Sequence, residues 1–397
     1  MGRLRIALVT ETFLPKVDGV VTRLVATLPE LAARGHEVLV LAPPGAPEEF
    51  AGHRVLSAPG IPFPWYPEHT AARPSSALAT ELLEFQPDVV HVVNPVFFGA
   101  WGTWVARRNR LPLLASFHTD PKVVQRLKLG WFQRPLETID RELHNQAHVN
   151  LATSPQMVEL ARGLGIRRMR LWPKAVDSQR FHPTAATAGM RAKLTGGQPE
   201  APLVVYAGRV SFEKRVDVFA EAVKDLGASE AGRHVRFAVV GEGPALEWLQ
   251  EELSATPTVF TGFLDGAELA DAYASGDLFA FPSDSETLGF AAIEAMAAGV
   301  AVVAADAGGI PHIVKQGENG VLVPPGDGQA LAAALLELVH DEPRRTRLAR
   351  AGRAEAERWS WSSATEALIM RYRQAIRVRD LAQSQRQARG QPQRQPA

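Results

Sequence analysis

Two acidic residues in the second half of the chain have the surroundings of a binding site. Glu286 and Glu294 lie in the segment PSDSETLGFAAIEAMAAG, where a polar turn follows an apolar strand and a helix of small residues begins near Leu288. The backbone amides of Thr287 to Phe290, with the positive end of the helix behind them, suit a phosphate. A nearby carboxylate can accept hydrogen bonds from sugar or ribose hydroxyl groups. The alternative is that Glu286 belongs only to the helix cap and that Glu294 is simply exposed.

Two cations follow the first strand of the same half. Arg209 and Lys214 lie in the turn of VVYAGRVSFEKRVD, just past the end of a predicted strand. Two positive charges at this place can neutralise a diphosphate, and they can stabilise a departing nucleotide during a transfer reaction. Taken alone, this pattern is more often that of a solvated loop.

Glycines and a histidine at other strand ends are further candidates. Gly241 stands in VVGEGP after a strand, but the third glycine of a dinucleotide-binding motif is missing because position 246 is leucine. Gly19 precedes a helix in TETFLPKVDGVVTRL, where only a small residue lets the backbone approach a phosphate closely. A simple turn glycine is the alternative. His118 ends the strand of ASFHTD, although a lone histidine is usually structural.

Alternating strands and helices must position these residues. Short runs typical of strands alternate with amphipathic stretches of helical length, which indicates parallel sheets covered on both faces. The active site is then expected at the carboxyl ends of the strands, between the two halves. The expected helices include Val20–Arg34, Ser75–Phe85 and Pro155–Leu164. The expected strands are Arg5–Thr10, Glu37–Ala42, Asp88–Val93, Leu113–His118, Val149–Thr153, Leu203–Ala207, Phe237–Val240, Val259–Thr261, Leu278–Pro282 and Val300–Ala304.

A looser segment separates the two halves. Residues 176–202 interrupt the alternation with proline and glycine and are the best candidate for a linker. We therefore predict a first Rossmann-like domain over residues 1–185 and a second one over residues 186–360. A helix over residues 361–380 is expected to pack back on the first domain. The Gln- and Arg-rich residues 381–397 are expected to be disordered.

The composition excludes several classes of protein. Lys and Arg together number 43, as do Asp and Glu, so no overall field attracts nucleic acid. Cysteine is absent, which rules out disulfides and zinc–thiolate sites and fits a reducing compartment. No segment approaches the roughly 18 apolar residues of a membrane-spanning helix. We expect a cytoplasmic protein and leave open a peripheral attachment to the inner face of the cell membrane.

The chain resembles the family 4 retaining glycosyltransferases, which have the GT-B fold. The pattern S-x-x-E-x-x-G-x-x-x-x-E-A-M-A-x-G matches their E-x7-E signature, and G-R-x4-K matches their phosphate clamp. The resemblance implies an α/β architecture of two doubly wound Rossmann-like domains facing each other across a deep cleft. It also implies that the C-terminal helix returns to the first domain. The phrases FPWY, KAVDSQRFHP, VFTGFLDGAELADAYASGD and SETLG are similar to those of bacterial sulfoquinovosyl diacylglycerol synthases and GDP-mannose-dependent α-mannosyltransferases.

The resemblance also assigns roles to the candidates. It implies that Glu294 binds the donor ribose and Glu286 the transferred sugar, while His118 contacts the donor sugar. In TGFLDG, Asp265 lies where members of the family contact the base of the nucleotide, and its carboxylate could accept hydrogen bonds from the N1–H and N2–H groups of guanine. The favoured alternative is that Asp265 only initiates the following helix. The expected catalytic residues are His118, Arg209, Lys214 and Glu286. The expected donor-binding residues are Gly19, Arg209, Lys214, Gly241, Leu264, Asp265, Glu286, Thr287, Leu288, Gly289 and Glu294.

Three positions depart from the family pattern. Asp18-Gly19 replaces a pair of glycines, so a close phosphate contact there depends on one glycine. Ala175 replaces a glycine, and His312 replaces an acid. The implied reaction is retaining transfer, with a phosphate oxygen of the leaving group as base. No cofactor and no metal are expected beyond the nucleoside-diphosphate sugar, because the two cations can do the charge work of a metal.

The acceptor is harder to predict. Residues 122–134, KVVQRLKLGWFQR, contain four basic residues and no acid, so they could rest on anionic lipid or form an ordinary basic surface helix. We favour a hexosyl transfer from GDP-mannose or a UDP-hexose to a lipid such as diacylglycerol or a glycolipid. The alternatives are a soluble acceptor such as a sugar phosphate, a NAD-dependent dehydrogenase, or an inactive sugar-nucleotide binding module. No nucleic-acid partner is expected.

Overall fold

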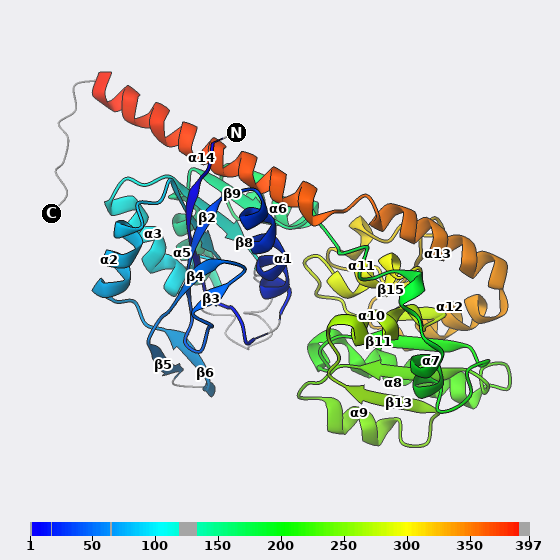
Figure 1. The fold of residues 1–397 in the computed structure, drawn as a ribbon. Coiled ribbons are helices and arrows are strands. Elements are labelled where there is room, and N and C mark those ends of the chain that lie inside the picture. The colour runs from blue at the N-terminus through cyan, green and yellow to red at the C-terminus, as the bar shows by residue number, and fades with distance from the viewer. Residues whose placement is uncertain (1, 17, 64–65, 119–132, 389–397) are drawn as a thin grey trace. The chain divides into compact units, whose positions relative to one another are not determined.

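The computed structural model describes residues 2–16, 18–63, 66–118 and 133–388. The chain divides into unit 1, Met1–Pro173 with Trp361–Ala397, and unit 2, Lys174–Ser360. Each unit is a mainly parallel sheet covered by helices (Figure 1). The predicted fold class of two doubly wound α/β units with a returning C-terminal helix is therefore confirmed. The division falls after residue 173, earlier in the chain than the predicted residue 185.

The main sheet of unit 1 is parallel except for one short strand at its edge. Its strands are β1 (Arg5–Thr10), β2 (Glu37–Ala42), β3 (Glu49–Phe50), β4 (His53–Ser57), β7 (Val89–Val93), β8 (Leu113–Phe117), β9 (Val149–Ala152) and β10 (Met169–Leu171). They lie in the order β10-β9-β8-β7-β1-β2-β4-β3, and only β3 runs antiparallel to its neighbour. A separate antiparallel pair, β5 (Gly60–Phe63) and β6 (Tyr66–Ala72), follows β4.

Alternate residues of the unit 1 strands pack on opposite faces of the sheet, as the strand period of two requires. Ile6 and Leu8 of β1 belong to the same core cluster as residues of α1 (Gly19–Ala33) and α14 (Trp361–Ala388). Ala7 and Val9 belong to the cluster that contains residues of α2 (Ser76–Glu84) and α3 (Phe98–Arg108). Among the described residues, the other helices of this unit are α5 (Gln133–Asn145) and α6 (Pro155–Gly163).

The C-terminal helix completes the core of unit 1. In Figure 1, α14 (orange to red) crosses the sheet beside β8 and β9, and it contacts β7, β8 and β9. Leu368, Ile369 and Tyr372 are at most 2% exposed. The predicted disorder from residue 381 is wrong for residues 381–388, because α14 continues to Ala388. Ala, Gln and Arg favour helix even without an apolar stripe, so an existing helix can extend through them.

Unit 2 contains an entirely parallel sheet. Its strands are β11 (Leu203–Ala207), β12 (Arg236–Val240), β13 (Thr258–Gly262), β14 (Leu278–Phe281), β15 (Ala301–Ala305) and β16 (Val321–Val323). Their order is β13-β12-β11-β14-β15-β16. The helices are η2 (Pro183–Ala185), α7 (Ala188–Leu194), η3 (Phe212–Lys214), α8 (Val216–Ala228), α9 (Leu246–Glu252), α10 (Gly266–Ala274), α11 (Phe290–Ala297), η4 (Ile310–His312), α12 (Gly328–His340) and α13 (Glu342–Ala356).

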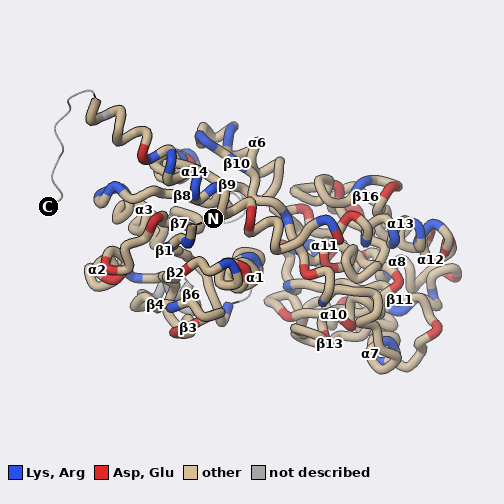
Figure 2. Tube along the Cα trace, turned by 45° about the horizontal axis from the view of Figure 1, so that its top comes forward, with Lys and Arg blue, Asp and Glu red and all other residues tan. Residues whose placement is uncertain are grey.

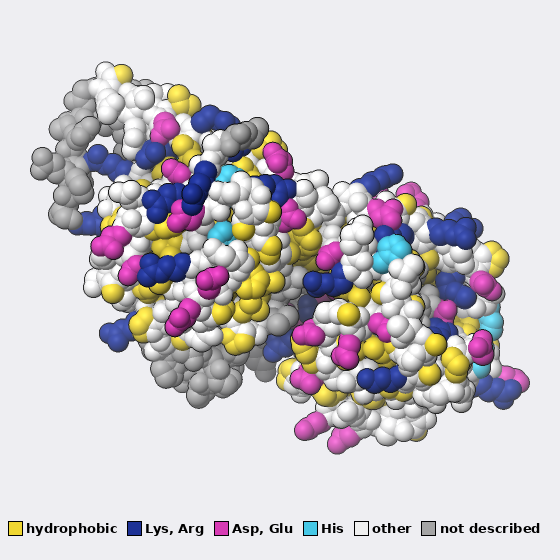
Figure 3. Space-filling view, in the orientation of Figure 1, with side chains coloured by type: hydrophobic (Ala, Val, Ile, Leu, Met, Phe, Trp, Pro, Cys, Tyr) yellow, Lys and Arg dark blue, Asp and Glu magenta, His cyan; other side chains and the backbone are white. Residues whose placement is uncertain are grey.

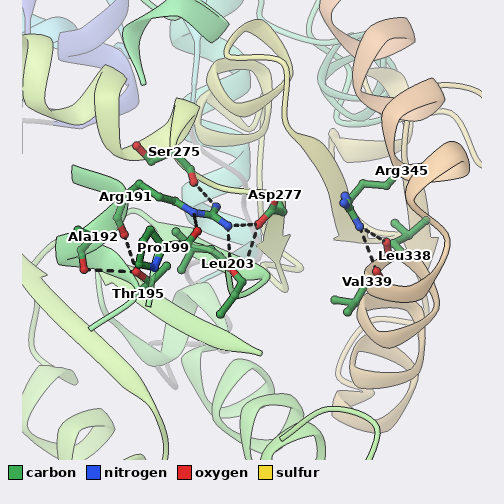
Figure 4. A network of polar contacts seen from close by, with 11 residues as sticks. Arg191, Ala192, Thr195, Pro199, Leu203, Ser275, Asp277, Leu338, Val339 and Arg345 are labelled. Carbon is green, nitrogen blue, oxygen red and sulfur yellow. Dashed lines mark hydrogen bonds and ion pairs between the residues drawn. The ribbon is translucent and has the colours of Figure 1, made fainter. Parts of the chain in front are cut away.

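Two apolar layers cover this second sheet. One contains residues of α10 and α11, and the other contains residues of α8, α9 and α12. The segment predicted as a loose linker holds η2 and α7, and α7 is fixed to the sheet by a partly buried network of hydrogen bonds (Figure 4). Arg191 of α7 donates to Asp277 Oδ2 at 2.8 Å and to the Ser275 carbonyl at 2.6 Å, and the same Asp277 oxygen accepts from the Leu203 amide at 2.8 Å. This segment is therefore an integral part of unit 2.

Charged residues of both signs are mixed on the surfaces of the two units. In Figure 2 they lie along helices such as α13, whereas β7 and β11 carry none. The visible faces in Figure 3 show basic and acidic side chains interspersed, in keeping with the equal numbers of each in the sequence. None of the helices in the described ranges has the length and apolar character needed to cross a bilayer.

Candidate functional site

The polar turn after β14 places Glu286 against Lys214. Lys214 Nζ donates to Glu286 Oε1 at 2.6 Å, and the two side chains are 27% and 11% exposed. Lys214 ends η3 after β11, while Glu286 follows β14, and these two strands are neighbours in the sheet. Because carboxyl ends of adjacent parallel strands meet at one edge, the fold brings together two residues that are far apart in sequence. Both residues are among those predicted for the donor site.

A pair of glycines supports the turn that carries Glu286. The Gly309 amide donates to the Glu286 carbonyl at 2.7 Å. A Cβ atom on Gly308 would lie 2.5 Å from the Glu286 carbonyl oxygen, and one on Gly309 would lie 2.4 Å from the Thr287 carbonyl oxygen. Only glycine allows this close approach. Sequence reasoning noted the segment GGIPHIV for His312 but did not connect its glycines with Glu286.

The start of α11 also depends on glycine. Gly289 is the N-cap of α11 with φ 75°, and a Cβ atom there would lie 2.5 Å from Ile310 Cδ1. The helix begins at Phe290, slightly later than the predicted Leu288. Leu288 is 5% exposed and packs in the core, so only its backbone can serve a ligand. Thr287 is half-buried beside it.

Glu294 lies on α11 and is held by α10. Tyr273 Oη donates to Glu294 Oε2 at 3.0 Å. Burial raises the pKa of Glu294 to about 7, although the Tyr273 hydrogen bond and the charge of Arg180 act in the opposite direction. Glu294 is therefore half-buried and hydrogen-bonded, and it is not the simply exposed acid of the alternative interpretation. Sequence reasoning did not find Tyr273, because a contact between two helices leaves no local pattern.

Arg209 lies where the loops after β11 and β12 meet. A Cβ atom on Gly241 would lie 2.1 Å from the Gly208 carbonyl oxygen, so Gly241 is required by contact between the two loops. Tyr206 Oη donates to the Arg209 carbonyl at 2.9 Å and fixes its backbone. The Arg209 side chain is exposed, and its guanidinium makes no ion pair with any described residue. It is thus available to an anionic ligand.

The segment TGFLDG forms the end of β13 and the start of α10. Leu264 is 8% exposed and belongs to the core. Asp265 occupies the N-cap position of α10 with extended backbone, but its side chain makes no capping hydrogen bond. The favoured interpretation of Asp265 as a helix-initiating residue therefore agrees with its position, while its exposed carboxylate is not used for capping.

Two of the predicted site residues, His118 and Gly19, lie in unit 1. His118 Nε2 lies 2.8 Å from Ser116 Oγ, and its ring packs edge-on against Trp172. Burial, aided by the charge of Arg23, lowers the pKa of His118 to about 3, so the ring is neutral at physiological pH. Gly19 is the first residue of α1, whose N-cap is Asp18.

The departure at Asp18 has a structural consequence. Asp18 Oδ1 accepts from the amides of Val20 and Val21, each at 2.9 Å, and Asp18 Oδ2 accepts from Thr12 Oγ1 at 2.9 Å. A side-chain carboxylate thus occupies the first amides of α1, where the resemblance led us to expect a phosphate contact. The amides of Val20 and Val21 are therefore already satisfied by the chain itself.

The other two departures lie close together in unit 2. Lys174 Nζ donates to the His312 carbonyl at 2.7 Å and lies 4.0 Å from the centre of the Trp359 ring. Burial lowers the pKa of Lys174 to about 8. Ala175 is fully buried and is not among the described non-glycine residues with positive φ. The backbone at this position therefore does not need glycine.

Two further predictions concern metal ions and membrane contact. Within the described ranges, no group of three or more His, Asp or Glu side chains is placed to hold a metal ion. Most of the basic segment 122–134 lies outside the described residues, and only Gln133 and Arg134 fall within them, at the start of α5.

Comparison with known proteins matches a glycosyltransferase family model to each half of the chain. Residues 17–180 match "Glycosyltransferase Family 4", and residues 201–341 match "Glycosyl transferases group 1". Sulfoquinovosyl transferase SQD2 of Arabidopsis thaliana is 37% identical over 84% of this chain, which spans 66% of that protein. A GDP-mannose-dependent alpha-mannosyltransferase of Mycobacterium tuberculosis is 36% identical over 97% of this chain and 100% of the relative.

A solved structure agrees with this family on the fold. Sucrose-phosphate synthase from Thermosynechococcus elongatus superposes with a TM-score of 0.75 at 22% identity, covering 94% of this chain and 99% of that chain. At this level of identity, the likeness bears on the fold alone, which is the GT-B fold.

Proposed function

Because this chain belongs to the family 4 glycosyltransferases, we propose that it transfers a hexosyl unit from GDP-mannose or a UDP-hexose to a lipid such as diacylglycerol or a glycolipid. The family, the GT-B fold and the class of enzyme predicted from the sequence are confirmed. The chain is a glycosyltransferase that uses a nucleotide sugar. The donor, the acceptor and the roles of the site residues are the parts that we propose.

The Lys214–Glu286 pair carries the proposed donor site. The pair is largely buried, and the exposed cation Arg209 follows the same strand as Lys214. We assign the donor diphosphate to the two cations and a hydroxyl of the transferred sugar to Glu286. Within this partly desolvated setting, cations placed in advance stabilise charge that develops on the leaving group.

The proposed reaction retains the configuration of the sugar. The bond from the anomeric carbon to the diphosphate oxygen breaks, and a bond to the acceptor oxygen forms on the same face. The acceptor proton passes to a phosphate oxygen of the departing nucleotide. Arg209 and Lys214 stabilise the extra negative charge of that nucleotide, so this chain supplies electrostatic stabilisation and orientation.

A surface stripe along α3 and its N-cap residue Phe97 supports a lipid acceptor and an anionic membrane partner. Phe97, Trp101, Trp104 and Arg108 recur at the spacing that places them on one face of the helix. Phe97 is 62% exposed and Trp104 is 56% exposed. The Arg108 guanidinium lies 5.7 Å from the centre of the Trp104 ring. Exposed aromatic rings next to arginine suit the boundary between lipid headgroups and acyl chains.

Transfer assays with defined acceptors test the proposal. Purified protein is incubated with GDP-mannose or UDP-glucose, labelled in the sugar, and with vesicles of phosphatidylglycerol that contain diacylglycerol. The lipids are then extracted into an organic solvent, and the label in that solvent is measured. A parallel reaction contains a soluble sugar phosphate. We expect a glycolipid product with one of the donors and little product with Lys214→Gln. Transfer only to the sugar phosphate would contradict the lipid acceptor and favour the soluble alternative.

Variants of α3 separate membrane contact from donor chemistry. Trp104→Ser together with Phe97→Ser should reduce both co-sedimentation with phosphatidylglycerol vesicles and transfer to the vesicle acceptor. The matched control is Met370→Ser, which removes a 47% exposed apolar side chain from α14. Unchanged co-sedimentation of the double variant would remove α3 from the proposal.

A further inference from the structure

Four polar side chains form a continuous hydrogen-bonded row inside unit 1. Tyr372 Oη lies 2.9 Å from His91 Nδ1, and His91 Nε2 lies 3.1 Å from Ser116 Oγ. The same Ser116 Oγ lies 2.8 Å from His118 Nε2. Tyr372, His91 and Ser116 are fully buried, whereas His118 is half-buried at the end of the row. The row thus joins the C-terminal helix to a residue proposed for the donor site.

The row is shielded by a tryptophan. Trp172 is 1% exposed, and its ring centre lies 5.7 Å from that of His91 and 6.2 Å from that of His118. Burial lowers the pKa of both His91 and His118 to about 3. Each ring is therefore neutral at physiological pH and carries one N–H proton, either on Nδ1 or on Nε2.

The direction of the hydrogen bonds follows from the tyrosine. Tyr372 Oη has His91 Nδ1 as its one polar partner among the described residues, so the phenol proton is satisfied only if Tyr372 donates to that nitrogen. His91 must then carry its proton on Nε2 and donate it to Ser116 Oγ. The Ser116 hydroxyl has one proton, which it donates to His118 Nε2.

The opposite direction leaves a buried donor unpaired. If His118 Nε2 donated to Ser116, Ser116 would donate to His91 Nε2, and His91 Nδ1 would donate to Tyr372. The phenol proton of Tyr372 would then lack an acceptor within the described part of the chain, and an unpaired buried donor is unfavourable. The two directions of the hydrogen bonds therefore differ in free energy, and the difference comes from the hydroxyl group of Tyr372.

We propose that Tyr372 is a positioning residue that, through His91 and Ser116, fixes His118 as the Nδ1–H tautomer. His118 then presents a hydrogen-bond donor at Nδ1, because its Nε2 is engaged by Ser116. A neutral donor can orient a sugar hydroxyl or hold a carbonyl, and it cannot act as a base at Nε2. Only the consequence for turnover rests on the proposed function, since the tautomer itself is a property of unit 1.

Nitrogen NMR of the full-length protein measures the tautomer directly. The protein is labelled with ¹⁵N-histidine, and the His118 signals are identified by their loss in His118→Gln. We expect a protonated Nδ1 and an unprotonated Nε2 for His118 in the wild type. In Tyr372→Phe and in Ser116→Ala, the His118 signals should shift toward a mixture of tautomers. Ile369→Val, a buried change on the same helix, is the matched control and should leave them in place.

The outcomes separate this inference from the proposed function. A wild-type His118 protonated on Nε2 overturns the inference without any variant. Unchanged His118 signals in both Tyr372→Phe and Ser116→Ala also overturn it. If the tautomer shifts in Tyr372→Phe and turnover of the nucleotide sugar falls with little change in KM, both proposals are supported. If the tautomer shifts but turnover stays the same, the inference stands and the donor-sugar role of His118 is contradicted.

Discussion

The carboxyl group of Glu294 experiences two opposing influences. Burial on α11 raises its pKa to about 7, while the hydrogen bond from Tyr273 favours the charged form. Ribose hydroxyl groups are donors, so the role that we propose for Glu294 needs an ionised carboxylate. The stability of the folded protein without ligand depends on pH in the opposite sense, because the folded protein favours the protonated carboxyl group. Since the pKa of Glu294 in the folded protein lies above the ordinary value of 4.5, the contribution of this group to the free energy of unfolding is fully present below pH 4.5. It is lost as the pH rises through 7.

Donor binding is therefore expected to depend on pH. Between pH 6 and pH 8, the ionised fraction of a group with a pKa of about 7 rises about tenfold, and the affinity for the nucleotide sugar should rise similarly. The measurement is isothermal titration at both pH values. Glu294→Gln should bind more weakly at pH 8 and lose most of this dependence. A Glu294→Gln variant with the full wild-type pH profile would show that another group is responsible.

At the scale of elements, the donor site depends on contacts between loops that the sequence does not place together. The ten expected strands lie close to where they were predicted, because alternating strands and helices leave a periodic pattern. The sequence did not predict β3 to β6, β10 or β16. Lys214 and Glu286 were predicted for one site from the positions of two strand ends and from the family resemblance, but their mutual contact was not predicted. Tyr273 and the pair Gly308 and Gly309 were missed, since each acts through a neighbouring element rather than a local motif.

The glycine loop gives a prediction at this scale. In Gly309→Ala, the added Cβ atom would lie 2.4 Å from the Thr287 carbonyl oxygen, so the turn that carries Glu286 must move. We expect a loss of about 1–3 kcal/mol in the free energy of unfolding and weaker donor binding. Denaturant titration and calorimetry measure the two effects.

The matched control for this variant is another glycine with more space. In Gly189→Ala, the nearest atom to the new Cβ is Thr187 Oγ1 at 3.9 Å, and Gly189 lies within α7. Alanine is the better helix former, so stability should rise by up to about 1 kcal/mol with donor affinity unchanged. Equal donor affinity in Gly309→Ala and the wild type would contradict the supporting role of the loop.

At the scale of the whole molecule, the last helix belongs to the unit that begins the chain. The sequence predicts this return through the family resemblance, but not that α14 extends to Ala388. Nor does it predict that residues 174–185 belong to unit 2, because this boundary is set by packing between distant segments. In unit 1, α14 supplies both core side chains and the Tyr372 hydroxyl of the polar row.

Removing one of those core side chains should destabilise the protein. Leu368 is 1% exposed in the core of unit 1, so Leu368→Ala should lower the free energy of unfolding by about 2–5 kcal/mol. Met370→Ala, on the exposed side of the same helix, should change it by less than about 0.5 kcal/mol. Urea denaturation compares the two. Similar losses for both variants would mean that α14 does not contribute to the core as described.

The central claim is that the residues around the Lys214–Glu286 pair bind the nucleotide-sugar donor. Isothermal titration of GDP-mannose and UDP-glucose tests it most directly, with wild type, Lys214→Ala, Glu294→Ala and the control Met370→Ala. We expect the wild type and Met370→Ala to bind at least one donor. We expect Lys214→Ala and Glu294→Ala to bind it much more weakly, with their folds intact by circular dichroism. Wild-type affinity in both of these variants would contradict the assignment of the donor site.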